Sequence, residues 1–143
     1  MDEDTKTAEF VKLPFEYMKD RRKGIGLVAP FDFALDDECW RWLPADVPLY
    51  VTRTERLEHT EVTTKLAEEV SDAATVVPAV RSLLSAEPSS IGYACTSGSF
   101  VNGVKGEAEL RSVMCEAGAL AAVTTSGALL QAVAALGVRR IAI

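Results

Sequence analysis

Short apolar runs at regular intervals constrain the fold of this chain more than any other feature. They lie at residues 24–30, 47–53, 90–94, 120–123 and 139–143. Several of them are apolar at successive rather than alternate positions, which is typical of strands buried on both faces of a parallel sheet. The runs therefore predict strands in a sheet that helices cover on both sides.

Helical patterns fill the intervals between these runs. The clearest pattern has apolar side chains at i, i+3, i+4 and i+7 and a glycine after them as a C-cap: Leu110, Val113, Met114, Ala117 and Gly118. Another helix face consists of Val76, Val77, Val80, Leu83 and Leu84, and Pro88 shortly after them ends the helix. A shorter helix before it is marked by Val62, Leu66 and Val70. A last helix covers about residues 126–136, is closed by Gly137, and should turn Leu129, Leu130 and Val133 inward. The alternation predicts an α/β fold, a doubly wound, mainly parallel open sheet of about four to five strands with right-handed crossovers.

The chain is long enough for one core. Its 143 residues, of which 48% are hydrophobic, can bury about 68% of their unfolded surface without disulfides or metals. Residues 1–23 are charged and lack a sustained period, so we expect an N-terminal arm followed by a single α/β domain at 24–143. No helical pattern follows the run at 139–143 to cover it, and we expect a truncated or half-length chain.

Composition excludes several classes of function. Fifteen Lys and Arg against 21 Asp and Glu give a net charge of −6, which disfavours a general nucleic-acid or anionic-membrane surface. The three cysteines have no CxxC spacing and there is one histidine, so neither a disulfide framework nor a zinc site is predicted. The polar start and the lack of an apolar stretch of about 20 residues predict a cytoplasmic protein.

Two chemically similar segments follow neighbouring predicted strands. One is Cys95-Thr96-Ser97-Gly98, after the run at 90–94, and the other is Thr124-Thr125-Ser126, after the run at 120–123. Ligands of open parallel sheets bind outside the carboxyl ends of the strands. Small hydroxyls and glycine let O–H and N–H groups converge on an anionic oxygen, so the composition favours a carboxylate ligand.

Each of these residues also has a structural interpretation. N–H dipoles near Cys95 would favour a thiolate nucleophile or base, but a cysteine at a strand end is also a common buried packing residue. The Thr124 segment can be a helix N-cap. Pro30 and Asp32 follow the first strand and face the same crevice, where Asp32 is either a binding or acid/base group or a solvated loop residue. Arg53 ends the second strand and could pair with a substrate carboxylate or form an exposed salt bridge.

The remaining cysteines lie in predicted helices, Cys39 beside Trp40 and Trp42, and Cys115 in the middle of the helix that contains Leu110. We interpret both as packing residues.

The longer motifs resemble a known family. GIGLVAP at 24–30, VTRT at 51–54, YACTSGSFVNG at 93–103 and AVTTSGALLQAVAALGVRRIAI at 122–143 are similar to the Asp/Glu racemase superfamily, and most similar to its branch of maleate cis-trans isomerase and arylmalonate decarboxylase. Members have two similar α/β halves, with a reactive cysteine position in each half and the substrate carboxylate between them. This chain resembles the N-terminal half only.

The resemblance implies cofactor-independent chemistry on a small carboxylic or dicarboxylic acid. Cys95 takes the first-half cysteine position, and Thr96 and Ser97 take the oxyanion-binding positions. Thr124, Thr125 and Ser126 match a segment that borders the cleft. Arylmalonate-type decarboxylases lack a cysteine at the Cys95 position, so a cysteine here favours isomerase or racemase chemistry.

Two departures from the family pattern qualify that interpretation. Phe31-Asp32-Phe33 replaces the small polar loop with a substrate-contacting asparagine that maleate isomerases carry, so a bulkier or less acidic substrate than maleate is expected. The second-half cysteine lies beyond the matched part.

Two other functions fit the same residues. One is an arylmalonate-type decarboxylase. The other is a non-catalytic carboxylate-binding or interaction fragment that forms homo-oligomers through an exposed half-domain face.

Overall fold

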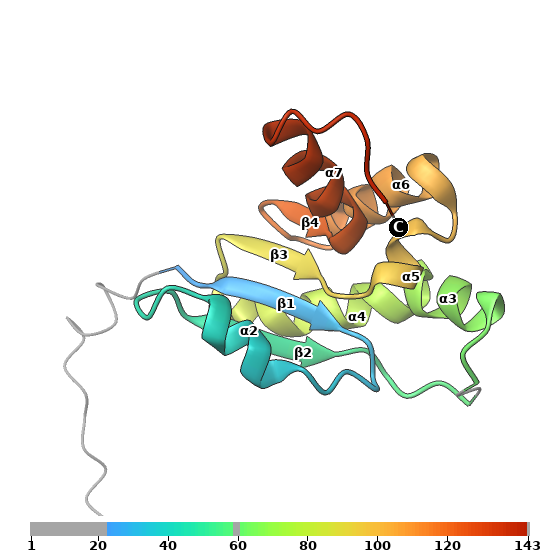
Figure 1. Ribbon diagram of the computed structural model, residues 1–143. Helices are drawn as coiled ribbons and strands as arrows, with labels where there is room; N and C mark the ends of the chain where they lie inside the picture. Colours follow the sequence, from blue (N-terminus) through green and yellow to red (C-terminus); the bar gives the residue numbers. More distant parts are fainter. Residues whose placement is uncertain (1–22, 59–60, 143) are drawn as a thin grey trace, which may run out of the picture.

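The computed structural model describes residues 23–58 and 61–142 and contains a parallel four-stranded sheet (Figure 1). Its strands are β1 (Ile25–Ala29), β2 (Leu49–Arg53), β3 (Ser90–Tyr93) and β4 (Ala122–Thr124). Their order is β2-β1-β3-β4. From β1 the chain crosses to β2 on one side of it, and the next connection carries the chain back past β1 to β3 on the other side. The switch point in strand order therefore lies between β1 and β3. In open α/β sheets, ligands bind at such a switch point.

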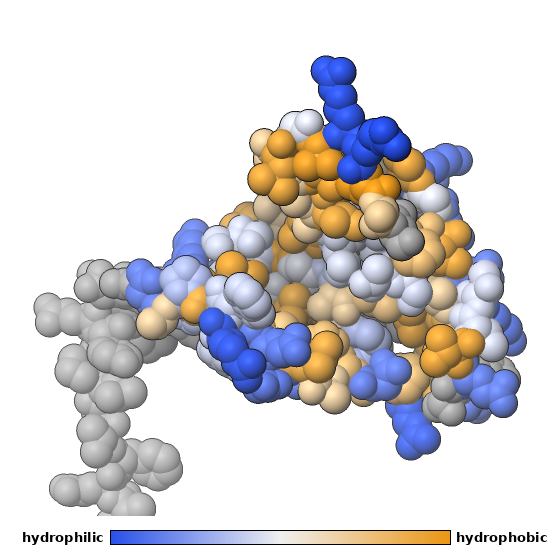
Figure 2. Space-filling model, in the orientation of Figure 1, coloured by the Kyte–Doolittle hydropathy of each residue, from blue (hydrophilic) through white to orange (hydrophobic). Residues whose placement is uncertain are grey.

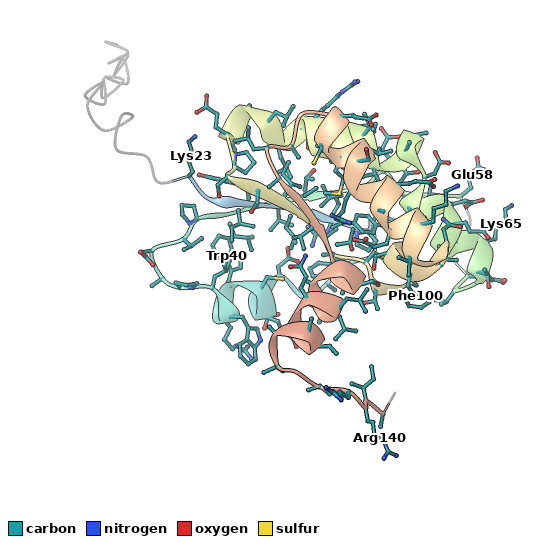
Figure 3. The ribbon with its side chains drawn as sticks, turned by 90° about the horizontal axis from the view of Figure 1, so that it is seen from above. Lys23, Trp40, Glu58, Lys65, Phe100 and Arg140 are labelled. Atoms are coloured by element: carbon teal, nitrogen blue, oxygen red, sulfur yellow. The ribbon has the colours of Figure 1, made fainter. Side chains whose placement is uncertain are left out.

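Helices lie on both faces of the sheet, as the alternation predicted. They are α2 (Asp36–Trp42), α3 (Thr64–Ser71), α4 (Ala73–Leu83), the 3-10 turn η1 (Leu84–Ala86), α5 (Thr96–Phe100), α6 (Gly103–Glu116) and α7 (Thr125–Ala135). Figures 1 and 3 show α3, α4 and α6 on one face and α2 and α7 on the other. The predicted α/β fold class is confirmed. The expected N-terminal arm lies almost wholly outside the described residues.

The core lies between the sheet and the helices α4 and α6. Buried side chains there include Val28, Val76, Val80, Leu83, Ile91, Tyr93, Leu110 and Met114. Most of the periodic positions that predicted these two helix faces are thus confirmed, while Val77, Leu84 and Val113 are only partly buried. Gly118 ends α6 with a φ of +120°, its N–H donating to Cys115 O and that of Ala119 to Met114 O. This Schellman arrangement is the predicted glycine C-cap.

Four expectations about the fold are wrong. Leu129 and Leu130 are 58% and 59% exposed, because α7 buries only Gly127, in its first turn. Residues 139–142 are exposed and form no strand, since they pair with none of the four strands of the sheet. Val62 precedes the Thr63 N-cap of α3 and is exposed, and Cys115 lies on the outer face of α6, so neither packs in the core.

Among the described residues, no helix is both long and apolar enough to cross a membrane.

Candidate active site at the carboxyl edge of the sheet

The strand register places the predicted site segments along one edge. Ala29 pairs with Arg53, Val28 with Tyr93, and Tyr93 with Thr124. Since all the strands are parallel, the residues that follow them emerge at the same edge. Pro30 and Cys95 therefore flank the switch point, with Arg53 on one side and the Thr124 segment on the other.

Cys95 is half-buried and is the N-cap of α5. Its Sγ accepts the Gly98 N–H at 3.4 Å and lies 3.6 Å from Ser97 Oγ. The side chains of Thr96 and Ser97 are exposed beside it. The geometry thus provides a thiol with hydroxyl neighbours at the switch point.

Tyr93 lies next to Cys95 and is bonded to α3. Its hydroxyl donates to Val70 O at 2.8 Å, and the ring is fully buried. Burial, and then the neighbouring Cys95 sulfur, raise the pKa of Tyr93 far above its usual range. The phenol therefore stays neutral, and its bond to Val70 holds the ring in place beside the Cys95 segment. A Cβ at Gly98 would lie 2.5 Å from the Tyr93 hydroxyl and 3.3 Å from Cys95 Sγ, so only glycine lets α5 approach this closely.

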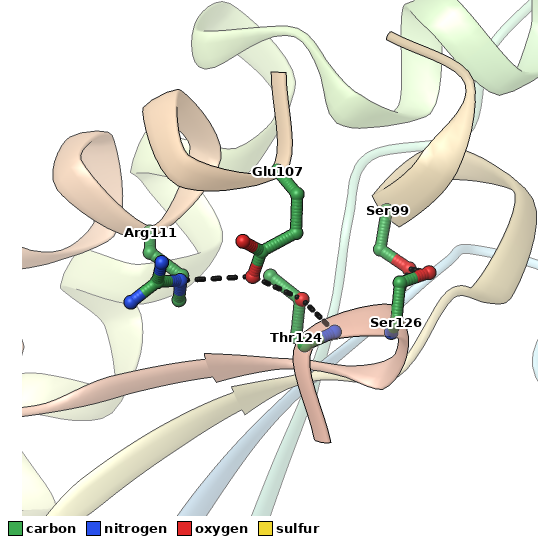
Figure 4. Close-up of polar contacts among 6 residues, drawn as sticks. Ser99, Glu107, Arg111, Thr124 and Ser126 are labelled. Atoms are coloured by element: carbon green, nitrogen blue, oxygen red, sulfur yellow. Dashed lines mark hydrogen bonds and ion pairs between the residues drawn. The ribbon is translucent and has the colours of Figure 1, made fainter. Parts of the chain in front are cut away.

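Two serines join the Cys95 segment to the Thr124 segment (Figure 4). Ser99 Oγ and Ser126 Oγ are 2.6 Å apart, and the Ser126 N–H donates to Ser99 Oγ at 3.1 Å. Ser99 donates its own hydroxyl hydrogen to Thr96 O at 2.8 Å. Since a hydroxyl has one hydrogen, Ser126 must be the donor in the Oγ–Oγ bond.

Thr124 is 1% exposed and caps α7. Its Oγ1 accepts the Gly127 N–H at 3.0 Å and donates to Glu107 Oε1 at 2.7 Å. Thr125 Oγ1 donates to Tyr93 O at 3.0 Å. With the Ser126 hydrogen also used, all three hydroxyl hydrogens of this segment are donated to protein acceptors. The N-cap interpretation of Thr124 is confirmed, and the hydroxyl donors that face outward lie in the Cys95 segment.

The loop after β1 is tied to the end of β2. Arg53 Nη2 forms a half-exposed salt bridge with Asp36 and donates to Phe33 O at 2.9 Å. Pro30 O accepts the Phe33 N–H in a turn, and Asp32 is exposed on that turn. The salt-bridge interpretation of Arg53 is therefore confirmed. The guanidinium thus holds the loop that follows Pro30 against the end of β2.

Two residues of this region were not predicted from the sequence. Ser99 is the last hydroxyl of the CTSGS motif and is buried although Thr96, one helical turn before it, is exposed, so helical spacing alone does not predict its position. Glu107 is 8% exposed and pairs with Arg111 at 2.8 Å. An i, i+4 Glu–Arg pair usually indicates a solvated helix face, so the sequence carries no signal that this carboxylate is buried against the start of α7.

Comparisons with known proteins identify the family. A family model described as arylmalonate decarboxylase matches residues 51–143, more than half of the chain. The chain belongs to the arylmalonate decarboxylase family. This confirms the resemblance predicted from the CTSGSF and TTSGALL motifs. No curated protein matches the chain.

Solved arylmalonate decarboxylase structures share the fold. A liganded variant, in which cysteine replaces a glycine and serine replaces a cysteine, is 31% identical over 85% of this chain and 49% of its own, with a TM-score of 0.69. The unliganded enzyme is 27% identical over 83% of this chain and 48% of its own, with a TM-score of 0.62.

The maleate isomerase Iso from Pseudomonas putida S16 is 21% identical over 80% of this chain and 50% of its own, with a TM-score of 0.57, and shares the fold. The chain thus spans about half the length of these solved relatives.

Proposed function

We propose that this member of the arylmalonate decarboxylase family is the N-terminal half of a cofactor-independent isomerase or racemase. Its substrate is a small carboxylic or dicarboxylic acid, and Cys95 is its catalytic residue. The observation that carries the proposal is the placement of Cys95 Sγ at the switch point, within 3.4 Å of the Gly98 nitrogen and 3.6 Å of Ser97 Oγ.

Substrate oxygens are assigned to the Cys95 side of the crevice. Thr96 and Ser97 present exposed hydroxyls there, and the first-turn N–H groups of a helix have no acceptors within the helix. Gly98 keeps the segment close to Tyr93. Thr125, Ser126 and Pro30 are assigned to the border of the substrate site, and Asp32 to the loop beside it. Arg53 and Thr124 have supporting roles: Arg53 holds the loop after β1, and Thr124 caps α7.

For a cis-enedioate the chemistry needs no external reagent. The Cys95 thiolate adds to one alkene carbon, and the π electron pair moves onto the other carbon and its carboxylate as an enediolate. Hydroxyl and N–H donors stabilise that charge. Rotation about the new single bond and expulsion of the thiolate then give the trans isomer, with no net change in protons or electrons. For an α-substituted acid, Cys95 would instead remove the α-proton, and a second acid would return it to the opposite face.

The test compares cysteines within one molecule. Iodoacetamide labelling at pH 7, read by peptide mass spectrometry, should modify Cys95 faster than the exposed Cys115, and a small dicarboxylate should slow Cys95 only. Burial, together with Asp36 and Glu38, raises the pKa of Cys39, which therefore supplies a slow reference.

Turnover supplies the second arm of the test. In the protein that contains both halves, Cys95→Ala should abolish cis-trans isomerisation or racemisation, whereas Cys115→Ala should leave it unchanged. Equal labelling of Cys95 and Cys115, or turnover by folded Cys95→Ala, would refute the assignment.

Decarboxylation is the second candidate function. The family match and the two relatives above 25% identity, both arylmalonate decarboxylases, favour it. Release of carbon dioxide from a substituted malonate, without isomerisation of an enedioate, would favour the decarboxylase over the isomerase.

Association through an apolar surface is proposed as well. Figure 2 shows hydrophobic side chains gathered over α7, where Leu129, Leu130 and Leu136 are exposed. A contiguous exposed apolar surface of this kind often marks a protein–protein interface. We expect a homo-oligomer by light scattering at micromolar concentration, and a strict monomer would count against it. Protection of Cys95 by a carboxylate, without turnover by the protein that contains both halves, would favour a carboxylate-binding fragment in place of the enzyme.

A further inference from the structure

Glu107 is a buried charged side chain to which the proposed chemistry gives no role. It lies on α6, is 8% exposed, and its Oε1 accepts hydrogen bonds from Thr124 Oγ1 at 2.7 Å and Arg111 Nε at 2.8 Å. We propose that Glu107 is a positioning residue, which holds the first turn of α7 and, through Ser126 and Ser99, the segment that carries Cys95. This inference rests on the proposed role of Cys95.

The first link runs from Glu107 to the start of α7 (Figure 4). Thr124 Oγ1 donates to the carboxylate and accepts the Gly127 N–H at 3.0 Å. A Cβ at Gly127 would lie only 2.5 Å from Glu107 Oε1, so the carboxylate lies directly against this turn. A negative charge beside a helix N-terminus is favourable. Glu107 therefore stabilises both the cap and the position of the turn.

The second link runs from α7 to α5. Ser126 donates both its N–H and its hydroxyl to Ser99 Oγ, and Ser99 donates to Thr96 O. Ser99 is 1% exposed, so water does not replace these bonds. Because α5 has only five residues, its own hydrogen bonds hold it weakly, and its position depends on its packing against α3, α6 and α7, of which the Ser126–Ser99 bonds fix the α7 side.

The last link is the contact of α5 with sulfur. The Gly98 N–H donates to Cys95 Sγ, and Gly98 and Ser99 are neighbours in α5. A shift of α5 would lengthen that N–H···S bond and the Ser97 contact. The reactivity of Cys95 therefore depends on a carboxylate that does not touch it.

The experiment follows Cys95 alkylation at pH 7 relative to Cys115, which is exposed on the same helix as Glu107. Glu107→Ala should slow Cys95 by about tenfold and leave Cys115 unchanged. Glu107→Gln keeps an oxygen acceptor for Thr124 and should stay within about threefold of the parent. Glu109→Ala is the matched control, since that glutamate is exposed on the same helix and pairs only loosely with Lys105 at 3.5 Å.

A second variant tests the route without touching the carboxylate. Ser99→Ala cuts the link between α7 and α5 and should slow Cys95 as much as Glu107→Ala does. Since both changes break one route, the double variant should be little slower than either single variant. Circular dichroism reports whether each variant is folded.

The outcomes separate this inference from the proposed function. Folded Glu107→Ala or Ser99→Ala with Cys95 labelling equal to or faster than the parent's would overturn the positioning role. Additive slowing in the double variant would also overturn it. If the slowing occurs but no carboxylic acid protects Cys95 in the parent, the positioning role stands and the proposed function fails.

Discussion

The close contact between Gly127 and Glu107 gives the sharpest prediction for stability. In Gly127→Ala the new methyl carbon would lie 2.5 Å from Glu107 Oε1 and 3.0 Å from Thr124 Oγ1, whereas ordinary contacts begin at 3.4 Å. The carboxylate must therefore move by about 0.9 Å, the difference between 3.4 and 2.5 Å. Such a movement weakens its bonds to Thr124 and Arg111, which are 2.7 and 2.8 Å long.

The size of the effect follows from opposing terms. Weakening two hydrogen bonds to a charged group costs about 2–4 kcal/mol, and alanine in place of glycine in a helix returns about 1 kcal/mol. We expect the free energy of unfolding to fall by about 2 kcal/mol, and Tm to fall by about 4–8 °C. Urea and thermal unfolding, followed by circular dichroism, measure both quantities.

A double-variant cycle tests the cause. In a Glu107→Ala background the methyl group that Gly127→Ala introduces has no carboxylate to displace, so the change should be neutral or stabilising by about 1 kcal/mol. If Gly127→Ala is as stable as the parent, or costs the same in both backgrounds, then the carboxylate does not lie against the first turn of α7.

Two further predictions concern buried hydroxyls. Thr54 is 4% exposed, and its Oγ1 has no hydrogen-bond partner in the part of the chain that the structure describes. Thr54→Val should therefore raise the free energy of unfolding by about 1 kcal/mol. The control Thr52→Val loses a 3.0 Å bond with Ser82 and should not stabilise the protein. Because the pKa of Tyr93 is raised in the folded state, its stabilising contribution is fully present below about pH 10 and is lost as the pH rises above that value. Between about pH 9 and 11 the free energy of unfolding should therefore fall less steeply in Tyr93→Phe than in the parent.

Much of the fold was predictable because its core has short sequence periods. Val76, Val80 and Leu83 repeat at helical spacing, and the runs around Val28 and Ile91 are apolar throughout, so hydrophobic pattern alone places them inside. The same reasoning failed for Leu129 and Leu130. An apolar helical pattern says that a face can be buried, but only the path of the chain decides whether anything packs on it.

The candidate site was predictable only in part. Cys95 and its hydroxyl neighbours follow a strand directly, so the rule for parallel sheets places them at the ligand edge. Glu107 is bonded to a residue 17 positions later in the chain, and its i+4 partner Arg111 makes it look like a surface ion pair. Contacts of this kind depend on the docking of two helices, which no local pattern encodes.

The two hydroxyl segments show how similar sequences can take different roles. CTSG and TTSG both begin at the end of a strand and both cap a helix with their first side chain, Cys95 in one and Thr124 in the other. The oxygen cap of Thr124 is buried and bonds in both directions, so it consolidates the fold. The sulfur cap of Cys95 is a weaker acceptor and remains half-buried, so it holds α5 loosely and stays accessible to a ligand. The difference between oxygen and sulfur at these two equivalent caps therefore separates a buried, supporting side of the edge from a half-buried side, where we propose that Cys95 reacts.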